Sequence, residues 1–200
     1  MAPRVAALLL AAGASRRMGT PKQLLLLGDK PVIRWCADSI MASGVQDLVV
    51  VVNAEGERIV AALKGLPAKV VRNNAADSQM ADSVRIGFRA LDDRVSGVLV
   101  CLSDHPLIAP ETFRTVIQAH HRKPVRIIIP CHGGRRGHPA LFPRTILDEV
   151  LSGGTLRDII GKDERRVQQV EVNDEGVLRD MDTVEDYQRV REMFARRSGS

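Results

Sequence analysis

Residues 5–22 read VAALLLAAGASRRMGTPK, an apolar run that passes directly into a loop of small residues with two arginines and a lysine. The apolar part, 5–12, is far too short to span a bilayer, and charge follows it at once. A cleaved secretory signal would discard the motif that this run leads into, so we interpret the run as a buried strand. Small residues let backbone N–H groups approach phosphate oxygens, and the cations neutralise phosphate charge. The segment therefore predicts a strand followed by an anion-binding loop.

Two well-known phosphate loops do not fit this segment. A dinucleotide-binding fingerprint requires further glycines where Ser15 and Met18 stand, and a Walker A loop requires glycine and lysine at Met18 and Gly19. An ordinary surface turn carrying arginine is the alternative for so short a segment. An NAD-dependent oxidoreductase is disfavoured because two of its required glycines are absent.

Strands and helices are predicted to alternate along the rest of the chain. Short runs rich in Val, Leu or Ile predict further strands at 48–52, 69–71, 98–102 and 126–129. Apolar residues at helical spacing lie between and after them, within 33–41, 59–63, 84–91 and 113–117. This order predicts an α/β fold, a three-layer α/β/α arrangement around a mostly parallel central sheet. Ligands of such folds bind at the carboxyl ends of the strands.

The region 130–172 interrupts this alternation. It contains glycines, a short predicted strand at 138–142 and predicted helices at 145–151 and 155–160. We expect it to form an inserted, substrate-facing lobe of one domain that covers residues 1–200. A strand at 177–181 and a helix over 184–194 are predicted to close the chain.

Composition narrows the function classes. Three cysteines lie far apart without a CxxC pair, which fits neither a disulfide framework nor a zinc site and favours a cytoplasmic location. The net charge of +5 is not accompanied by aromatic residues within a basic run, so we expect neither a nucleic acid partner nor a membrane partner. A phosphate-rich small substrate explains the charge equally well.

The whole string LAAG, SRRMG and PKQLL, from Leu10 to Leu25, resembles the signature of nucleotidyltransferases with a glycosyltransferase-A-like fold. It is most similar to the molybdenum cofactor cytidylyltransferase family. Three further segments resemble that family in the right order: LSDHP at 102–106, GHPALF at 137–142 and DMDTVEDY at 180–187. The similarity covers nearly the whole chain.

The resemblance implies catalytic roles for Lys22, Arg17 and Asp104. Nucleotide-binding positions are implied at Leu10, Ala11, Ala12, Gly13, Ser15, Arg17, Met18, Gly19, Lys22 and Ser83. Asp104 follows a predicted central strand and Asp182 precedes a predicted capping box, so both acids could share one magnesium ion, Mg²⁺. A turn or N-cap aspartate is the alternative for each acid.

The acceptor-binding positions implied by the resemblance are Gly137, His138 and Pro139, preceded by two arginines that suit an anionic acceptor. The alternative is a basic hairpin in which His138 bonds to its own backbone. This sequence departs from the family pattern in the segment 78–83, which lacks the usual glycines and carries Asp82, and at Val184 and His105. These departures concern the acceptor more than the chemistry.

The resemblance implies a magnesium-dependent enzyme that transfers CMP from CTP to molybdopterin and releases pyrophosphate. CTP is favoured because guanylyl-transferring relatives typically carry glycine where this chain has Ala12. A molybdoenzyme or its chaperone is the expected recipient of the product. A sugar phosphate or another phosphorylated compound is the alternative acceptor, and a non-catalytic nucleotide-binding cofactor chaperone is the alternative from another class.

Overall fold

The computed structural model describes residues 4–13, 21–75 and 79–198, and within them one mixed sheet forms the centre of the molecule. Its strands follow the order β10-β7-β9-β6-β1-β4-β5, and β8 pairs with β7. The strands are β1 (Val5–Ala11), β4 (Asp47–Asn53), β5 (Ala68–Asn73), β6 (Gly97–Leu102), β7 (Ile127–His132), β8 (Arg135–Arg136), β9 (Ala140–Pro143) and β10 (Val167–Glu171). β1 runs parallel to both β4 and β6, whereas β9 is antiparallel to β6 and β7. The predicted α/β fold with a mostly parallel sheet is confirmed.

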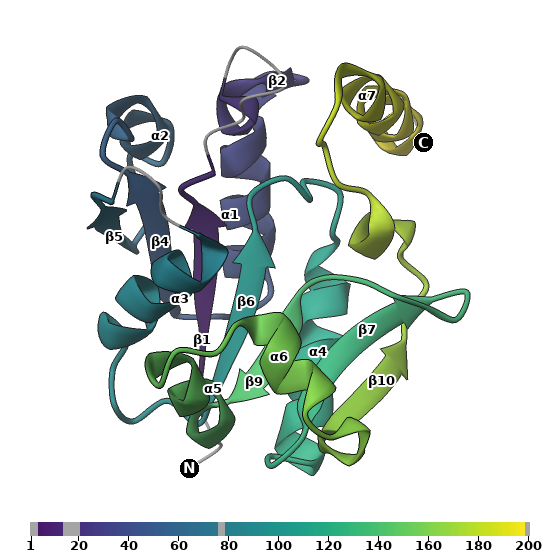
Figure 1. Cartoon of the computed structure of the whole chain (residues 1–200). Helices are drawn as coiled ribbons and strands as arrows, with labels where there is room; N and C mark the ends of the chain where they lie inside the picture. The colour runs from purple at the N-terminus through teal and green to yellow at the C-terminus, as the bar shows by residue number, and fades with distance from the viewer. Residues whose placement is uncertain (1–3, 14–20, 76–78, 199–200) are drawn as a thin grey trace.

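Side-chain alternation along β1 explains the two helical layers. Ala7 and Leu9 belong to one buried cluster, whereas Ala6 and Leu8 belong to the other, because successive residues of a strand point to opposite faces. Side chains of α1 (Val32–Ala42), α2 (Glu57–Ala62), α4 (Pro110–Arg122) and α7 (Val184–Ser198) pack in the first cluster. Those of α3 (Met80–Arg89), α5 (Arg144–Leu151) and α6 (Leu156–Gly161) pack in the second. Figure 1 shows α3, α5 and α6 in front of the sheet and α1 and α4 behind it.

Short elements complete the chain. They are the 3-10 turns η1 (Lys22–Leu24), η2 (Glu164–Arg166) and η3 (Glu175–Leu178), and the paired strands β2 (Leu26–Leu27) and β3 (Lys30–Pro31). None of the described helices is both long enough and apolar enough to traverse a lipid bilayer.

The region 130–172, expected as an inserted lobe, supplies both sheet strands and cavity-facing elements. β9 pairs with β6 and β10 pairs with β7, so part of the region belongs to the central sheet. β8 and α6 instead contribute side chains to a cavity described below. No strand was predicted at β10, because this edge strand carries polar Gln168 and Gln169 and is only partly buried.

The strand predicted at 177–181 is wrong. The chain forms η3 there, and Asp174 accepts a hydrogen bond from the Gly176 backbone N–H at 3.0 Å at the start of this turn. Val177 and Met181 are both fully buried. These two apolar side chains are buried although the backbone that carries them forms no strand, so the apolar pattern alone was misleading.

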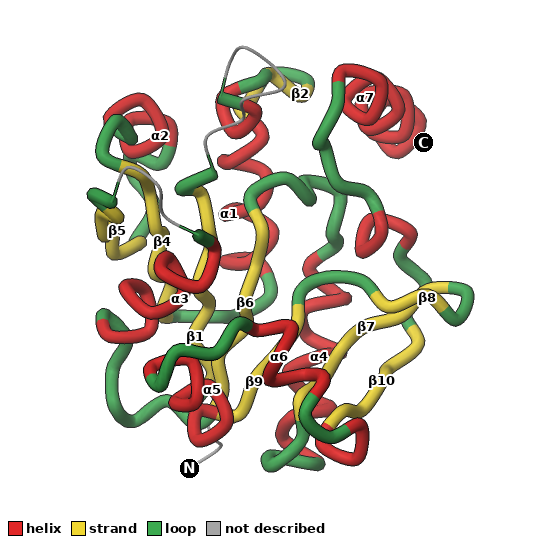
Figure 2. Tube along the Cα trace, in the orientation of Figure 1, coloured by secondary structure: helices red, strands yellow, loops and turns green. Residues whose placement is uncertain are grey.

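The carboxyl ends of β6 and β7 are held apart. β9 pairs with β6 only from Gly97 to Val100, and its one register pair with β7 joins Leu141 to Ile128. No described strand therefore covers the last two residues of β6 on that side, where the chain turns away towards α4. Figure 2 shows the β7–β8 hairpin extending beyond the helical layer at this edge.

Candidate active site

A cavity of about 730 Å³ opens at the carboxyl ends of β1 and β6. This is the edge at which parallel α/β sheets bind ligands. The volume lies within the usual range for small-molecule sites, roughly 300–1,000 Å³. Its described lining residues come from the β1 loop, α3, the β6 loop, the β8 hairpin, α6 and the segment before α7: Leu10, Ala12, Gly13, Lys22, Gln23, Gln79, Met80, Ser83, Leu102, Ser103, Asp104, His105, Arg135, Arg136, Gly137, His138, Arg157, Val177, Leu178, Asp180 and Asp182.

Lys22 joins two acids from distant parts of the chain. Its ammonium Nζ lies 2.6 Å from Asp104 Oδ2 and 2.8 Å from Asp182 Oδ1. η1 begins at Lys22, Asp104 follows β6 by two residues, and Asp182 lies two residues before α7. The side chains of Lys22 and Asp104 are each 14% exposed, whereas that of Asp182 is 51% exposed. One cation thus binds a mostly buried carboxylate and a solvent-facing one.

The charges of this group support one another. Burial alone would lower the pKa of Lys22, but Asp104 and Asp182 outweigh burial and raise it. Burial alone would raise the pKa of Asp104, but the hydrogen bond and charge of His105, together with Lys22, hold that pKa well below its usual range. Lys22 is therefore a cation and Asp104 an anion at neutral pH.

The capping box predicted after Asp182 is confirmed. The Thr183 hydroxyl accepts a hydrogen bond from the Asp186 backbone N–H at 3.1 Å, and the Thr183 N–H donates to the Asp186 carboxylate at 3.1 Å. This reciprocal cap starts α7 and fixes the backbone next to Asp182.

His105 holds the second oxygen of Asp104. Its ring nitrogen Nδ1 donates to Asp104 Oδ1 at 2.9 Å, while Oδ2 faces Lys22. His105 is only 7% exposed, and its ring packs edge-on against His138 with the ring centroids 5.0 Å apart. Both carboxylate oxygens of Asp104 thus have a fixed partner, and the carboxylate cannot rotate without losing one of them.

His138 is a neutral, partly buried imidazole. Burial, followed by the nearby His105, lowers the pKa of His138 to about 4, so this ring carries no charge at neutral pH. Its Nδ1 is buried and has no hydrogen-bond partner among the described residues. The alternative in which the ring bonds its own backbone is not observed; it is the His138 N–H that donates, to the Val177 carbonyl at 2.9 Å.

The loop before His138 is fixed by close backbone approach. A Cβ atom added at Gly137 would lie 2.4 Å from the Val177 carbonyl oxygen, so only glycine fits there. Gly137 and His138 line the cavity, and Pro139 is buried behind them. Two of the three expected acceptor-binding residues, Gly137 and His138, thus lie at the cavity wall, while the role of all three stays a prediction.

The expected nucleotide-binding residues fall into three groups. Those that line the cavity are Leu10, Ala12, Gly13, Lys22 and Ser83. Ala11 is completely buried within the sheet and does not line the cavity, so any contact from it to a nucleotide would come through its backbone. Ser15, Arg17, Met18 and Gly19 lie outside the described residues, and their roles stay predictions from the sequence.

The segment that lacks the usual glycines leads into α3. Ser83 is 4% exposed, and its hydroxyl accepts a hydrogen bond from the Asn73 amide at 3.0 Å. Asp82 accepts from the Gln79 backbone N–H at 2.9 Å and pairs with Arg85 at 2.7 Å. The unexpected negative charge of Asp82 therefore caps the helix and is balanced locally.

Sequence reasoning missed several cavity residues, among them Gln23, Asp180 and Arg157. Gln23 is 1% exposed and its amide donates to the Gly13 carbonyl at 3.2 Å, which ties η1 to the end of β1. Asp180 and Arg157 also line the cavity. The first acid of the DMDTVEDY segment was an available signal for Asp180, whereas an isolated arginine such as Arg157 carries no motif.

Asp104 and Asp182 supply only part of the ligand set that a divalent cation needs. Among the described residues, no group of three or more His, Cys, Asp or Glu side chains is arranged to hold a metal. Asp104 Oδ2 and Asp182 Oδ1 nevertheless converge on one cation, the Lys22 ammonium. Two carboxylate oxygens, completed by water and substrate phosphates, are the donor set that magnesium usually takes. The residues present therefore fit magnesium as a pair of acids.

A family comparison and two curated relatives agree with this architecture. The profile of the MobA-like NTP transferase domain matches residues 7–170. Nicotine blue oxidoreductase of Paenarthrobacter nicotinovorans is 28% identical and is matched over 94% of this chain and 97% of that protein. The 2-C-methyl-D-erythritol 4-phosphate cytidylyltransferase of Frankia casuarinae is 36% identical over 70% of this chain. The chain spans only 48% of that cytidylyltransferase.

Solved structures are similar over the full fold. A crystal structure of a Mycobacterium tuberculosis protein superposes with a TM-score of 0.86 at 28% identity and covers 96% of this chain and 99% of that one. A structure of the same bacterial protein in complex with manganese has a TM-score of 0.79 at 26% identity and covers 96% and 100% of the two chains.

Proposed function

Because this chain belongs to the MobA-like NTP transferase domain family, we propose that it transfers CMP from CTP to molybdopterin with release of pyrophosphate and requires magnesium. The observation that carries this proposal is the meeting of Lys22 with Asp104 and Asp182 at the wall of the cavity. Nucleotidyl transfer needs a cation and acids at one point, because charge on phosphate oxygens must be neutralised while the bond changes.

The reaction is an in-line substitution at the α-phosphorus of CTP. An oxygen of the acceptor phosphate forms the new bond to phosphorus, and the bond from that phosphorus to the bridging oxygen of the β-phosphate breaks. Pyrophosphate leaves with the electron pair of that bond. No covalent intermediate with the protein is needed, so the residues act by position and charge.

Lys22 stands between the two acids at the mouth of the phosphate loop. Its ammonium neutralises Asp104 and Asp182, and at the same position it can stabilise the triphosphate and the departing pyrophosphate. Magnesium bound by these two acids would neutralise phosphate oxygens and orient them. Arg17 is proposed from the sequence to add a second cation on the loop.

His105 keeps the reactive oxygen of Asp104 in place. Because His105 Nδ1 occupies Oδ1, Oδ2 is directed towards Lys22. His105 is thus a positioning residue, since it acts through Asp104.

CTP is proposed as the nucleotide because Ala12 lines the cavity where a methyl group reduces the room next to the base. The Frankia casuarinae relative is a cytidylyltransferase, which supports a pyrimidine nucleotide. The manganese complex of the mycobacterial protein supports the use of a divalent cation.

A second candidate is an oxidoreductase, because the relative matched over nearly the whole chain carries that name. Against it, an electron-transfer reaction gives Lys22 and its two acids no evident role. A non-catalytic cofactor chaperone is disfavoured for the same reason. A sugar phosphate or another phosphorylated acceptor would use the same site as molybdopterin.

The test is pyrophosphate release by the full-length protein with each of the four nucleoside triphosphates, magnesium and molybdopterin. We expect release with CTP above GTP, dependence on both acceptor and magnesium, and loss with EDTA. A parallel reaction follows oxidation of reduced pyridine nucleotide with nicotine blue. Pyrophosphate release with GTP in preference to CTP would overturn the choice of nucleotide, and redox turnover without pyrophosphate release would overturn the transferase proposal.

A further inference from the structure

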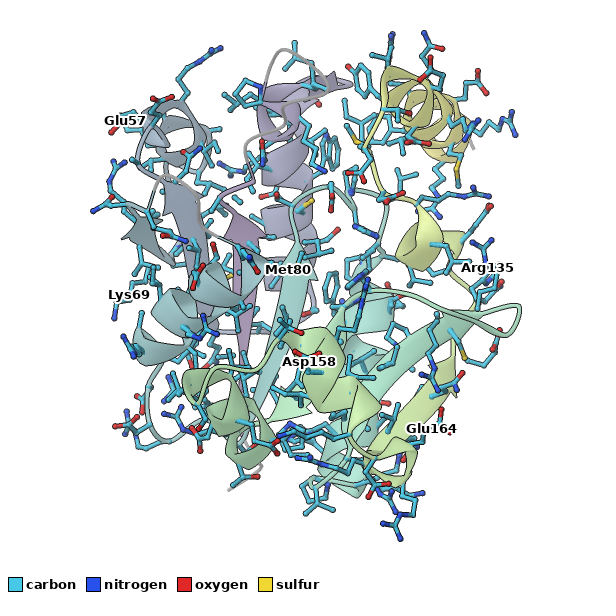
Figure 3. The ribbon with its side chains drawn as sticks, in the orientation of Figure 1. Glu57, Lys69, Met80, Arg135, Asp158 and Glu164 are labelled. Carbon is cyan, nitrogen blue, oxygen red and sulfur yellow. The ribbon has the colours of Figure 1, made fainter. Side chains whose placement is uncertain are left out.

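Three arginines line the cavity, and we refer to them together as the arginine wall: Arg135, Arg136 and Arg157. Arg135 and Arg136 form β8, and Arg157 lies in the first turn of α6. All three residues are exposed. Figure 3 labels Arg135 at the hairpin and Met80 on α3, with Asp158 of α6 lying lower and between them.

The hairpin that carries two of these arginines has a defined shape. Gly133 and Gly134 have φ angles of +57° and +75°, values that favour glycine at both centres of a two-residue hairpin turn. β8 pairs back onto β7 through Cys131–Arg136 and His132–Arg135. The backbone of β8 is thus tied to the central sheet.

Within the part of the chain that the structure describes, the arginine wall forms no ion pair with a carboxylate. Most described arginines make ion pairs, for example Arg85 with Asp82 and Arg144 with Asp93, each at 2.7 Å. No ion pair joins Arg135, Arg136 or Arg157 to a carboxylate of the described residues. Arg136 faces the Gln169 amide, whose oxygen can accept from Arg136 Nη2 at 3.1 Å, a contact that orients the guanidinium but leaves its charge intact.

Charge in the cavity is therefore segregated. The cation of Lys22 is already matched by Asp104 and Asp182, whereas the arginine wall retains net positive charge. Guanidinium groups bind phosphate oxygens through two parallel N–H donors, and they favour phosphate over neutral groups.

Sheet order places β8, with Arg135 and Arg136, across the cavity from the carboxyl end of β1. β7, which carries the hairpin, is separated from β1 by β9 and β6. Three strand spacings of about 4.8 Å put β7 roughly 14 Å from β1. Asp104, after β6, lies between the two sides. In-line transfer requires the entering group and the departing pyrophosphate on opposite sides of the α-phosphorus. With the triphosphate at the β1 loop, the entering group comes from the side of the arginine wall.

We propose that the arginine wall is a separate anion subsite that binds the phosphate monoester of the acceptor, with Arg157 as an acceptor-binding residue. The proposal rests on the proposed function for the direction of attack. Neutral His138, in the same loop, adds a hydrogen-bonding group and no charge. The substrate class is a phosphorylated acceptor with an accessible dianionic phosphate, and a neutral alcohol acceptor would leave the arginines unmatched.

The test measures inorganic phosphate binding by ³¹P NMR titration, without nucleotide and at saturating CTP with magnesium. The variants are Arg157→Gln, Arg135→Gln and the double variant, with Arg89→Gln as a control. Arg89 ends α3, is exposed and does not line the cavity. Because the substituted side chains are exposed, folding should be retained, and a thermal melt of each variant verifies it.

We expect wild type to bind phosphate while CTP is bound, and the double variant to bind it at least 10-fold more weakly. The dissociation constant for CTP should change less than 2-fold, and Arg89→Gln should match wild type. Unchanged phosphate binding in the double variant overturns the subsite. If the double variant loses CTP binding to the same extent, or if CTP abolishes phosphate binding to wild type, these arginines hold the triphosphate. Either result also overturns the proposed subsite.

The two proposals fail separately. If wild type binds no nucleotide, the proposed function fails. Phosphate binding that still depends on Arg157 without nucleotide would then support an anion subsite of a protein with another activity.

Discussion

Replacing Lys22 by alanine removes a cation that the two site acids share. Lys22 Nζ lies 2.6 Å from Asp104 and 2.8 Å from Asp182, so the change takes away the cation that both carboxylates contact among the described residues. In the proposed reaction it also removes a preorganised partner of the triphosphate. The loss of one such partner raises the barrier by roughly 3 kcal/mol, which corresponds to about a 150-fold fall in kcat.

The cost in stability should be smaller. Breaking a fully buried ion pair costs about 3–5 kcal/mol, but Asp182 is half exposed and Asp104 keeps its bond to His105, so we expect about 1–2 kcal/mol. Because the pKa of Asp104 is lowered in the folded protein, this carboxylate stabilises the fold fully above the ordinary carboxyl pKa, near 4. That stabilisation is lost as the pH falls through the lower pKa of the folded state. The difference between wild type and variant should therefore be largest at neutral pH and shrink in acid.

The same change should have an opposite effect on metal binding. Without the ammonium, Asp104 and Asp182 are free to hold a divalent ion, so Lys22→Ala should bind manganese more tightly than wild type in the absence of nucleotide. The assays are pyrophosphate release at saturating CTP, urea denaturation and a manganese titration followed by electron paramagnetic resonance. Lys69→Ala is the matched control, since Lys69 is exposed and donates only to the Ala90 carbonyl among described partners. A kcat within twofold of wild type at saturating CTP would refute the role given to Lys22.

Three further predictions follow from single contacts. His105→Met removes the hydrogen-bond donor to Asp104 Oδ1 and should weaken manganese binding about 10-fold, whereas His105→Gln, which can still donate, should bind manganese nearly as tightly as wild type. Equal manganese binding by the two variants would contradict the positioning role of His105. Gly87→Ala places a Cβ 2.1 Å from Leu8 Cδ1 and should lower the free energy of unfolding by about 1–3 kcal/mol in urea denaturation, and an unchanged midpoint would show that α3 can shift. Burial, followed by His121, lowers the pKa of His120 to about 4, so the neutral side chain stabilises the fold above pH 6.5, by at most about 3 kcal/mol, and this contribution is lost as the pH falls to 4. The free energy of unfolding of His120→Asn should therefore fall less over that pH range than that of wild type, and parallel pH profiles of the two proteins would contradict this prediction.

The local features of the site could be predicted from the sequence. The β1 strand and its loop are continuous in sequence, and the capping box before α7 involves residues three positions apart. Such features depend on the backbone and side chains of neighbours, so composition and spacing are sufficient to predict them. The strand at 177–181 failed because buried single residues and paired strands give the same apolar signal.

Only the tertiary structure decided which charges meet. Lys22 and Asp104 are 82 positions apart, and Lys22 and Asp182 are 160 apart, yet both acids contact one ammonium. The neutral state of His138 and the unmatched charge of the arginine wall likewise depend on burial and on which partners the fold brings near. The sequence by itself determined the fold class, the central strands, most of the helices and the residue types at the strand ends, because those follow from local periodicity. The pairing of those residue types was decided by strand order, because electrostatic and hydrogen-bond energies depend on distance in space and not on distance along the chain.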